Sequence, residues 1–169
     1  VIVTEPSYQG TIGAVAGIVA AGHEHGVPVV VDQAWGAHLG MADGMPEHAL
    51  ALGADALVTS AHKMLPAYSQ AALVAVQGAR IDLDRVDRAV GALETTSPTS
   101  SVLASIDAAR AFLGSEDGRA AIRRTATLVA RARERLTGLG LLAPGAETYG
   151  EGRVDPLKLF VHLAAAGRD

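Results

Sequence analysis

The sequence predicts an α/β fold: a mainly parallel sheet with helices on both faces and one antiparallel strand. Three observations carry this prediction. Short Val-rich runs alternate with helical patterns along the first half of the chain, in the order of a β-α-β-α-β unit. These runs are continuously apolar, as strands that are covered on both faces must be. The 169 residues, 49% hydrophobic and 19% charged, suit one compact domain with a core.

The first elements follow one another in a regular order. Strands are expected at residues 1–3, 27–32 and 55–60, and helices at residues 10–26 and 46–53. A fourth strand is expected at residues 71–77. It begins fewer than about a dozen residues after position 60, which is too few for a parallel crossover, so we expect it to run antiparallel.

From residue 81 onward the chain is mostly helical in pattern. We expect helices at residues 82–94, 102–114 and 115–140, with a break rich in Ser, Thr and Pro at residues 95–101. Ser115 and Asp117 suit a helix start. The last apolar run, at residues 157–163, predicts a strand of another substructure.

Composition excludes several classes of function. The net charge of −4 and the pI near 5.8 give no basic surface for nucleic acid. The chain has no cysteine, so it offers neither disulfides nor thiol ligands for zinc, and a reducing cytoplasm fits best. No signal peptide and no membrane-spanning run is recognisable. The chain opens on Val1 within an apolar run, and we expect it to be a piece of a longer protein.

Polar residues follow two of the predicted strands. Asp32 closes one strand, and Ser60, His62 and Lys63 close the next. In open α/β sheets the ligand crevice lies at the carboxyl ends of the parallel strands, so we expect these residues to face one another. Asp32 alone could cap a helix or stabilise a loop, and Lys63 alone could extend to the surface. A structural ion pair between the two, without a ligand, is a further alternative.

A carboxylate and an amine at neighbouring strand ends suit pyridoxal phosphate. This cofactor requires a lysine amine for its Schiff base and a carboxylate that keeps its ring nitrogen protonated. Lys63 follows an apolar pattern that predicts burial, and burial would lower its pKa and make the amine a better nucleophile.

Two other patterns are less informative. The segment "HEH" at residues 23–25 could bind a metal, but it ends a predicted helix, where histidines favour the dipole and face water. The Arg-rich segment at residues 121–136 is interpreted as a solvated amphipathic helix rather than a surface for nucleic acid or membrane.

Several segments together resemble one enzyme family. They are "VDQAWGAHLG", "GADALVTSAHKMLPAYSQAAL", "ETTSPTSSVLASIDAAR" and "DPLKL". In their order and spacing they are similar to signature segments of the ornithine/lysine/arginine decarboxylases, pyridoxal-phosphate enzymes of the aspartate aminotransferase fold. The likeness extends from Thr4 to Leu159, and the combination is far more specific than any single motif.

The resemblance implies roles for individual residues. Lys63 would carry the Schiff base, and Asp32 would bind the pyridine nitrogen. Ala34 would lie against one face of the cofactor ring, and Ser60 would bond the phosphate. His62 would adjoin the Schiff base and assist phosphate or substrate. No metal is implied.

The resemblance also implies a homodimer or a higher homo-oligomer. Thr96 and Ser97 would reach the cofactor phosphate of a neighbouring subunit. They could instead serve as an ordinary helix cap before "PTSSVLASID", which begins at residue 98, and the two roles can coexist.

This sequence departs from the family pattern next to Asp32. Relatives have Glu and His where Gln33 and Trp35 stand, so any role of those residues does not transfer, and Trp35 could instead shape the substrate entrance. His38 matches the last histidine of the motif. Its function stays open between a polar wall of the site and a structural loop contact.

The function implied is the decarboxylation of ornithine, lysine or arginine to a polyamine precursor. Residues 1–150 would be part of the cofactor-binding major domain, and residues 151–169 would begin the segment that leads to the C-terminal region. Such a fragment would be inactive by itself. The alternatives are another enzyme of the same fold, such as an aminotransferase, aldolase or desulfurase, and a non-catalytic paralogue.

Overall fold

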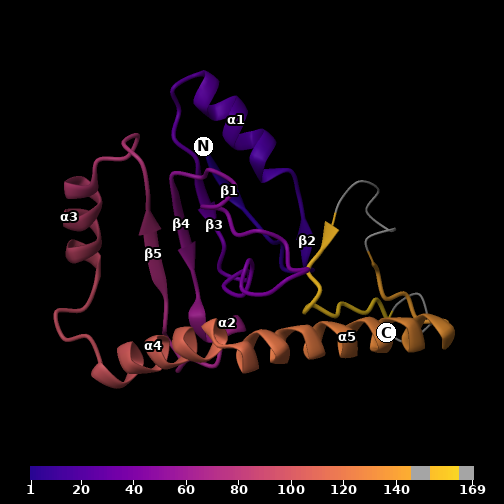
Figure 1. The fold of residues 1–169 in the computed structure, drawn as a ribbon. Helices are drawn as coiled ribbons and strands as arrows, with labels where there is room; N and C mark the ends of the chain where they lie inside the picture. The colour runs from indigo at the N-terminus through magenta and orange to yellow at the C-terminus, as the bar shows by residue number, and fades with distance from the viewer. Residues whose placement is uncertain (146–152, 164–169) are drawn as a thin grey trace.

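The computed structural model describes residues 1–145 and 153–163. Its larger sheet has four strands, in the spatial order β1 (Ile2–Thr4), β3 (Val30–Asp32), β4 (Ala56–Thr59) and β5 (Leu73–Val76) (Figure 1). β3 pairs in parallel with both β1 and β4, whereas β5 pairs with β4 in antiparallel. The predicted α/β class, the mainly parallel sheet and the antiparallel strand are confirmed.

The direction of β5 follows from the short connection that precedes it. Only the one-turn helix α2 (Ala61–Met64) and a loop separate β4 from β5. A crossover helix cannot form in so few residues, so the chain turns back and Thr59 pairs with Leu73. Gln70 in this loop has a φ of 72°, a conformation that is uncommon outside glycine.

Helix α1 (Val15–Glu24) covers one face of the sheet. Val15 and Val19 on the helix pack against Val29 and Val31 of the β3 segment in a cluster of buried residues. Burying a valine side chain contributes about 1.5–3 kcal/mol. This cluster therefore fixes the helix on the sheet and positions the carboxyl end of β3.

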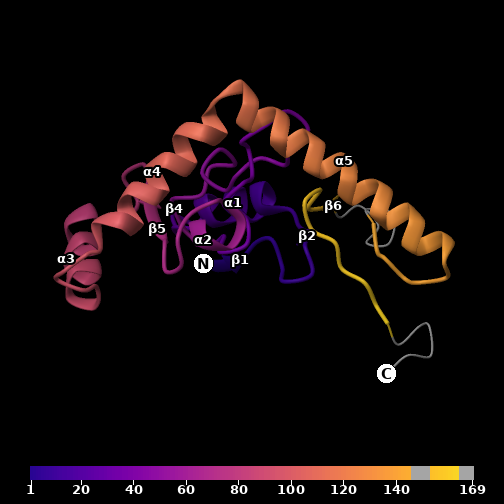
Figure 2. The ribbon, with the colours of Figure 1, turned by 90° about the horizontal axis from the view of Figure 1, so that it is seen from below.

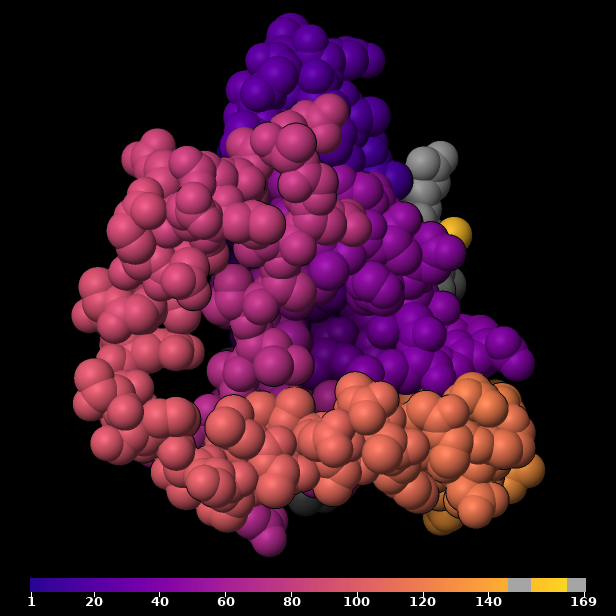
Figure 3. All heavy atoms as spheres, turned by 60° about the vertical axis from the view of Figure 1, so that its left-hand side comes forward, coloured from indigo at the N-terminus to yellow at the C-terminus, as the bar shows by residue number. Residues whose placement is uncertain are grey.

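The opposite face of the sheet is largely open. Ile2, Val58 and Val74 point to this side and are 81%, 40% and 49% exposed. Helix α3 (Leu83–Leu93) stands over this face at β5, and a pocket separates it from Val74 and Val76. Figure 3 shows the corresponding gap beside the sheet. Helices thus lie on both faces, as predicted, but α1 alone packs closely.

Helices α4 (Ser100–Gly114) and α5 (Glu116–Gly138) form an angled arm (Figure 2). Ser115 lies at the corner, where its hydroxyl accepts a hydrogen bond from the Gly118 N–H at 3.2 Å. A Cβ atom on Gly118 would lie 2.1 Å from the backbone oxygen of Phe112, so only glycine fits there. The predicted helix start at Ser115 is confirmed.

A second, two-stranded sheet brings distant parts of the chain together. β2 (Thr11–Ile12) pairs in antiparallel with β6 (Arg153–Val154). The Asp155 N–H donates to the Gly10 carbonyl at 2.8 Å, which extends this pairing by one contact. Residues 155–158 therefore lie beside the loop that precedes β2.

The strand predicted at residues 157–163 is wrong. This segment forms one isolated antiparallel bridge, between His162 and Leu142, and the short strand nearby is Arg153–Val154 instead. The boundary predicted between residues 150 and 151 falls outside the residues that the structure describes.

The helix predicted at residues 46–53 is also wrong. Residues 49–53 form turns, closed by a hydrogen bond from the Ala54 N–H to the Ala49 carbonyl at 3.0 Å. The segment starts at Pro46 and ends at Gly53, whose φ is 93°. Nucleating a helix is costly, and so short a segment gains too few helical bonds to offset that cost.

Candidate functional site

Asp32 lies at the carboxyl end of β3, on the open face of the sheet. It is the last residue of the strand and its side chain is exposed. One carboxylate oxygen accepts a hydrogen bond from the Ala34 N–H at 3.1 Å. This contact forms an Asx-turn, in which an Asp side chain binds the backbone two residues further on. Asp32 therefore stabilises its loop, as one alternative supposed, and still has an oxygen available for a ligand.

Ser60 to Lys63 lie at the carboxyl end of the neighbouring strand, β4. Ser60 precedes α2 in an extended conformation, and its side chain makes no capping hydrogen bond. Since β3 and β4 are paired in parallel, with Asp32 opposite Val58, the two sets of polar residues lie at the same edge of the sheet. The two strands are thus neighbours, as expected, and that their polar residues face one another stays a prediction.

Lys63 is exposed, which corrects the expectation of a buried amine. The one turn of α2 turns Ala61, which is fully buried, toward the core. Lys63 stands two positions further along the turn, and in a helix that separation puts a side chain on another side. The apolar pattern before Lys63 therefore indicates the burial of β4 and Ala61, and this burial does not extend to the Lys63 side chain.

Asp32 and Lys63 do not form the structural ion pair that was one alternative. Asp32 and Lys63 take part in no ion pair within residues 1–145 and 153–163. Both charges are available for a ligand in this arrangement.

His62 is held by the loop that leads to β5. Its Nδ1 lies 2.8 Å from the Ala71 carbonyl oxygen, and its backbone N–H donates to the same oxygen at 3.2 Å. A carbonyl only accepts, so Nδ1 carries a proton and Nε2 is left for another partner. The half-buried ring is thus fixed in one orientation beside Lys63.

An aromatic pair borders Lys63. Tyr8 and Trp35 meet edge to face, with ring centres 5.2 Å apart. The Lys63 ammonium nitrogen lies 5.0 Å from the centre of the Trp35 ring, within cation–π range. The ammonium of Lys158 lies at 3.7 Å from the same ring. Trp35 therefore touches the candidate site.

Lys158 is the residue that the assignment of roles from sequence missed. It belongs to the "DPLKL" segment, one of the segments that resemble the decarboxylase family. The resemblance implied no role for this lysine. A usable signal was present, because Lys63 and Lys158 are the two lysines of the whole chain. Burial lowers the pKa of Lys158 most, the charge of Lys63 lowers it further, and Asp155 opposes both.

His38 proves to be a structural contact. Its Nε2 lies 2.8 Å from a carboxylate oxygen of Asp155, and both side chains are 1% exposed. The same oxygen accepts the Leu157 N–H at 2.9 Å. This buried pair anchors the segment that carries Lys158 to the loop that carries Trp35.

Thr96 and Ser97 lie apart from the strand ends. Both are exposed, in the connection between α3 and α4, and neither forms a hydrogen bond with Asp32, Ser60, His62 or Lys63. The residue that precedes α4 is Thr99, so neither of them is its cap. Their predicted role toward a neighbouring subunit stays a prediction.

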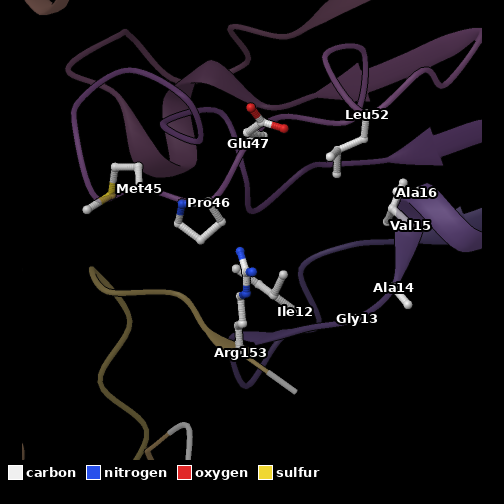
Figure 4. A pocket seen from close by; sticks show the side chains of 10 residues that line it. All are labelled: Ile12, Gly13, Ala14, Val15, Ala16, Met45, Pro46, Glu47, Leu52 and Arg153. Carbon is white, nitrogen blue, oxygen red and sulfur yellow. The ribbon is translucent and has the colours of Figure 1, made fainter. Parts of the chain in front are cut away.

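A cavity of about 500 Å³ lies elsewhere on the molecule, and Figure 4 shows its lining. It is bordered by the start of α1, the loop at residues 45–52 and Arg153. None of the strand-end residues lines it, so this cavity is separate from the candidate site.

Two further features concern metals and membranes. His23 of the "HEH" segment is engaged with Asp55, whose carboxylate oxygen lies 2.9 Å from its Nε2. Among the residues that the structure describes, no cluster of three or more His, Cys, Asp or Glu could hold a metal ion. In the same part of the chain no helix has the length and apolar character needed to cross a membrane.

The chain matches a known family and curated relatives. The family profile "Orn/Lys/Arg decarboxylase, major domain" matches residues 1–148. The arginine decarboxylase of Bacillus subtilis (strain 168) is 34% identical across 98% of this chain and 34% of its own length. That of Bacillus anthracis is 32% identical with the same coverage. The chain thus spans about a third of the length of these relatives.

Solved structures show the same fold. The constitutive lysine decarboxylase of E. coli superposes with a TM-score of 0.68 at 24% identity, over 95% of this chain and 27% of that one. A SepCysS–SepCysE N-terminal domain complex gives a TM-score of 0.55 at 13% identity, over 81% and 36%. At these identities the likeness concerns the fold. The family match rests on the sequence, and by it this chain belongs to the Orn/Lys/Arg decarboxylase family, as part of its major domain.

Proposed function

We propose that the whole protein decarboxylates a basic amino acid with bound pyridoxal phosphate, and that these residues supply much of the cofactor site. The observation that carries the proposal is the set of unengaged polar groups at one edge of the sheet. Among residues 1–145 and 153–163, Asp32 has a free carboxylate oxygen, Ser60 a free hydroxyl and Lys63 an ammonium without an ion-pair partner. They lie at the ends of two adjacent parallel strands.

These groups fit the cofactor by their chemistry. Pyridoxal phosphate presents a basic ring nitrogen, an aldehyde and a phosphate, which require a carboxylate, an amine and hydrogen-bond donors respectively. When bound, it withdraws the electrons that remain at the α-carbon as carbon dioxide leaves. Asp32 would hold the proton of the ring nitrogen, Lys63 would attach the cofactor covalently, and Ser60 would donate to the phosphate.

His62 and Ala34 would complete this side of the site. The Ala71 carbonyl fixes the His62 ring with Nε2 as the group left for cofactor or substrate. Ala34 is bound through its N–H to Asp32, so its small side chain stays beside the carboxylate. A methyl group there leaves room for a flat ring, which a larger side chain would fill.

The relatives favour arginine as the substrate. Those with the coverage given above are named arginine decarboxylases, and the family description also includes ornithine and lysine. The product would be the corresponding diamine or agmatine, a polyamine precursor. We also propose a cytoplasmic homodimer or higher homo-oligomer without nucleic-acid or membrane partners, in which Thr96 and Ser97 of one subunit approach the cofactor phosphate of the next.

Product identification tests the proposal. The whole protein, loaded with pyridoxal phosphate, is incubated with arginine, lysine and ornithine in turn, and the amine and carbon dioxide are quantified. We expect one of the three to yield equal amounts of both, with arginine preferred. Formation of a keto acid would indicate an aminotransferase, and bound cofactor without any product would indicate a non-catalytic paralogue; either result contradicts the proposal.

A further inference from the structure

The root of the Lys158 side chain is held in a fitted position. Gly10 has a φ of 91°, and a Cβ atom on it would lie 2.7 Å from Cγ of Lys158. The Lys158 N–H donates to the Asp155 carbonyl at 3.1 Å, and its own carbonyl accepts from Arg133 at 2.8 Å. The backbone and stem are therefore fixed, and the ammonium group has little freedom in where it can reach.

The end of the side chain lies over the aromatic pair. Its ammonium nitrogen is 3.7 Å from the Trp35 ring centre and 4.9 Å from that of Tyr8. Lys63 approaches the same indole at 5.0 Å. Both lysines of the 169-residue chain thus share one aromatic ring.

The charge of the Lys158 ammonium group is only partly balanced by the nearby carboxylate of Asp155. It takes part in none of the ion pairs found among residues 1–145 and 153–163. The nearest acid in sequence, Asp155, is engaged through one oxygen with His38 and the Leu157 N–H. Burial lowers the pKa of Lys158 most, the charge of Asp155 raises it, and the charge of Lys63 lowers it again, with a net shift downward. A partly desolvated ammonium beside a second cation favours an anion as its ligand.

The substrate of the proposed reaction carries such an anion. Its α-carbon bears both the amine that must reach Lys63 and the carboxylate that is to leave. An amino acid whose amine reaches Lys63 therefore brings its carboxylate close to the Lys63 side chain. A second ammonium beside the same indole is suitably placed to receive it.

We propose that Lys158 binds the α-carboxylate of the amino-acid substrate, with Trp35 and Tyr8 holding its ammonium toward Lys63. This inference rests on the proposed function and extends it to a substrate-binding residue. Trp35 would position Lys158 through its ring face. The product amine lacks the carboxylate, so it would lose this contact. It would therefore dissociate from the site more readily than the substrate does.

A comparison of two ligands tests the inference. Arginine and agmatine differ only in the carboxylate, and both can be titrated in an Asp32→Asn background, where turnover is expected to be lost. Their dissociation constants are read from the absorbance of the bound cofactor in the whole protein. With Lys158→Met we expect arginine to bind about 10- to 100-fold more weakly and agmatine to change by no more than about twofold.

Matched variants separate this effect from others. Lys158→Arg should restore most of the arginine affinity, because it keeps the positive charge. Arg110→Met removes an exposed positive charge of α4 and should change neither ligand. Lys158→Met retains the stem carbons that pack on Gly10, so the fold should persist; if it does not, Lys158→Gln provides the same comparison.

Each other outcome overturns the inference. Equal weakening of arginine and agmatine would mean that Lys158 shapes the site without binding carboxylate. Weaker cofactor retention with an unchanged preference between the two ligands would assign Lys158 to the cofactor phosphate. If neither the preference for arginine over agmatine nor the retention of the cofactor changed, Lys158 would bind neither substrate nor cofactor. The proposed function is tested separately, because its failure would appear as absent amine product in the wild-type protein.

Discussion

Asp32 combines two tasks in one side chain. One oxygen closes the turn with Ala34, and the other is free at the edge of the sheet. The position of this carboxylate, like those of Ser60 and Lys63, could be predicted because strand ends are visible in sequence. The position of Trp35 beside two ammonium groups could not, because Lys158 arrives from the far end of the chain through the pairing of β2 with β6.

Replacement of Asp32 tests its role in the reaction. In Asp32→Asn the side-chain oxygen still accepts from Ala34, so the loop should persist and the cofactor should still bind Lys63. An amide cannot hold the ring nitrogen protonated, so we expect kcat to fall by at least about 100-fold, the scale of losing one electrostatic contact to a developing charge. Steady-state rates and the absorbance of the bound cofactor measure the two effects. A variant with wild-type turnover would make Asp32 merely structural.

At the scale of elements, two buried carboxylates connect segments that are distant in sequence. Asp155 joins the loop after β3 to the segment after β6 through His38, and Asp55 joins the end of α1 to β3. Neither pair could be predicted from local pattern, since each forms only when the sheet has assembled. The same holds for residues 46–53, where apolar periodicity suggested a helix that Pro46 and Gly53 shorten to turns.

Loss of the His38 side chain should loosen the segment that carries Lys158. His38→Ala leaves the buried Asp155 carboxylate without this hydrogen-bond partner, and a buried polar group that loses its partner costs on the order of 1–3 kcal/mol. We expect the midpoint of urea unfolding to fall accordingly. The double variant His38→Ala/Asp155→Ala should be less destabilised than the sum of the two single variants. Strict additivity would show that the two side chains do not interact.

The Asp55 contacts predict a dependence of stability on pH. Burial raises the pKa of this carboxyl, but hydrogen bonds from the Val29 N–H and His23 and the charge of Arg80 outweigh it, so the pKa is lowered. A lowered folded-state pKa means that the stabilisation is present above the unfolded value, about 3.9, and is lost as the pH falls through the folded value.

Thermal unfolding of Asp55→Asn and wild type at several pH values measures this contribution. Near pH 6 we expect the variant to be less stable by about 2–3 kcal/mol, the worth of one hydrogen bond to a buried charged group. The gap should narrow as the pH falls below about 4, because the Asp55 carboxyl of the unfolded wild-type chain then binds a proton while the folded carboxyl, with its lowered pKa, still resists protonation. A gap that stays constant down to pH 2.5 would contradict the assignment.

For the whole molecule, the open face of the sheet is the main departure from a closed domain. Ile2, Val58 and Val74 are exposed there, and Leu93 and Leu128 on the helices are 89% and 63% exposed. The antiparallel direction of β5 could be predicted from the short connection that precedes it. The uncovered face could not be predicted, because continuous apolar strands indicate a covering layer without saying which residues supply it.

The 169 residues produced alone should therefore associate and should not turn over substrate. Exposed apolar surface of this kind favours self-association. The chain spans about a third of the relatives' length, so the remainder of an enzyme of that size would be missing. Light scattering and an assay for amine product measure both properties. A monodisperse monomer that decarboxylates arginine at a typical enzymatic rate, on the order of 10 per second, would contradict this expectation.

Lys63 is the residue proposed to carry the cofactor. Borohydride reduction of the loaded whole protein fixes pyridoxal phosphate to the lysine that binds it, and peptide mapping by mass spectrometry then locates the label. This stretch of sequence contains two lysines, so any label within it lies on Lys63 or on Lys158. We predict the label on Lys63 and an unlabelled Lys158. A label on Lys158, or the absence of label from both lysines, would contradict the assignment of the site.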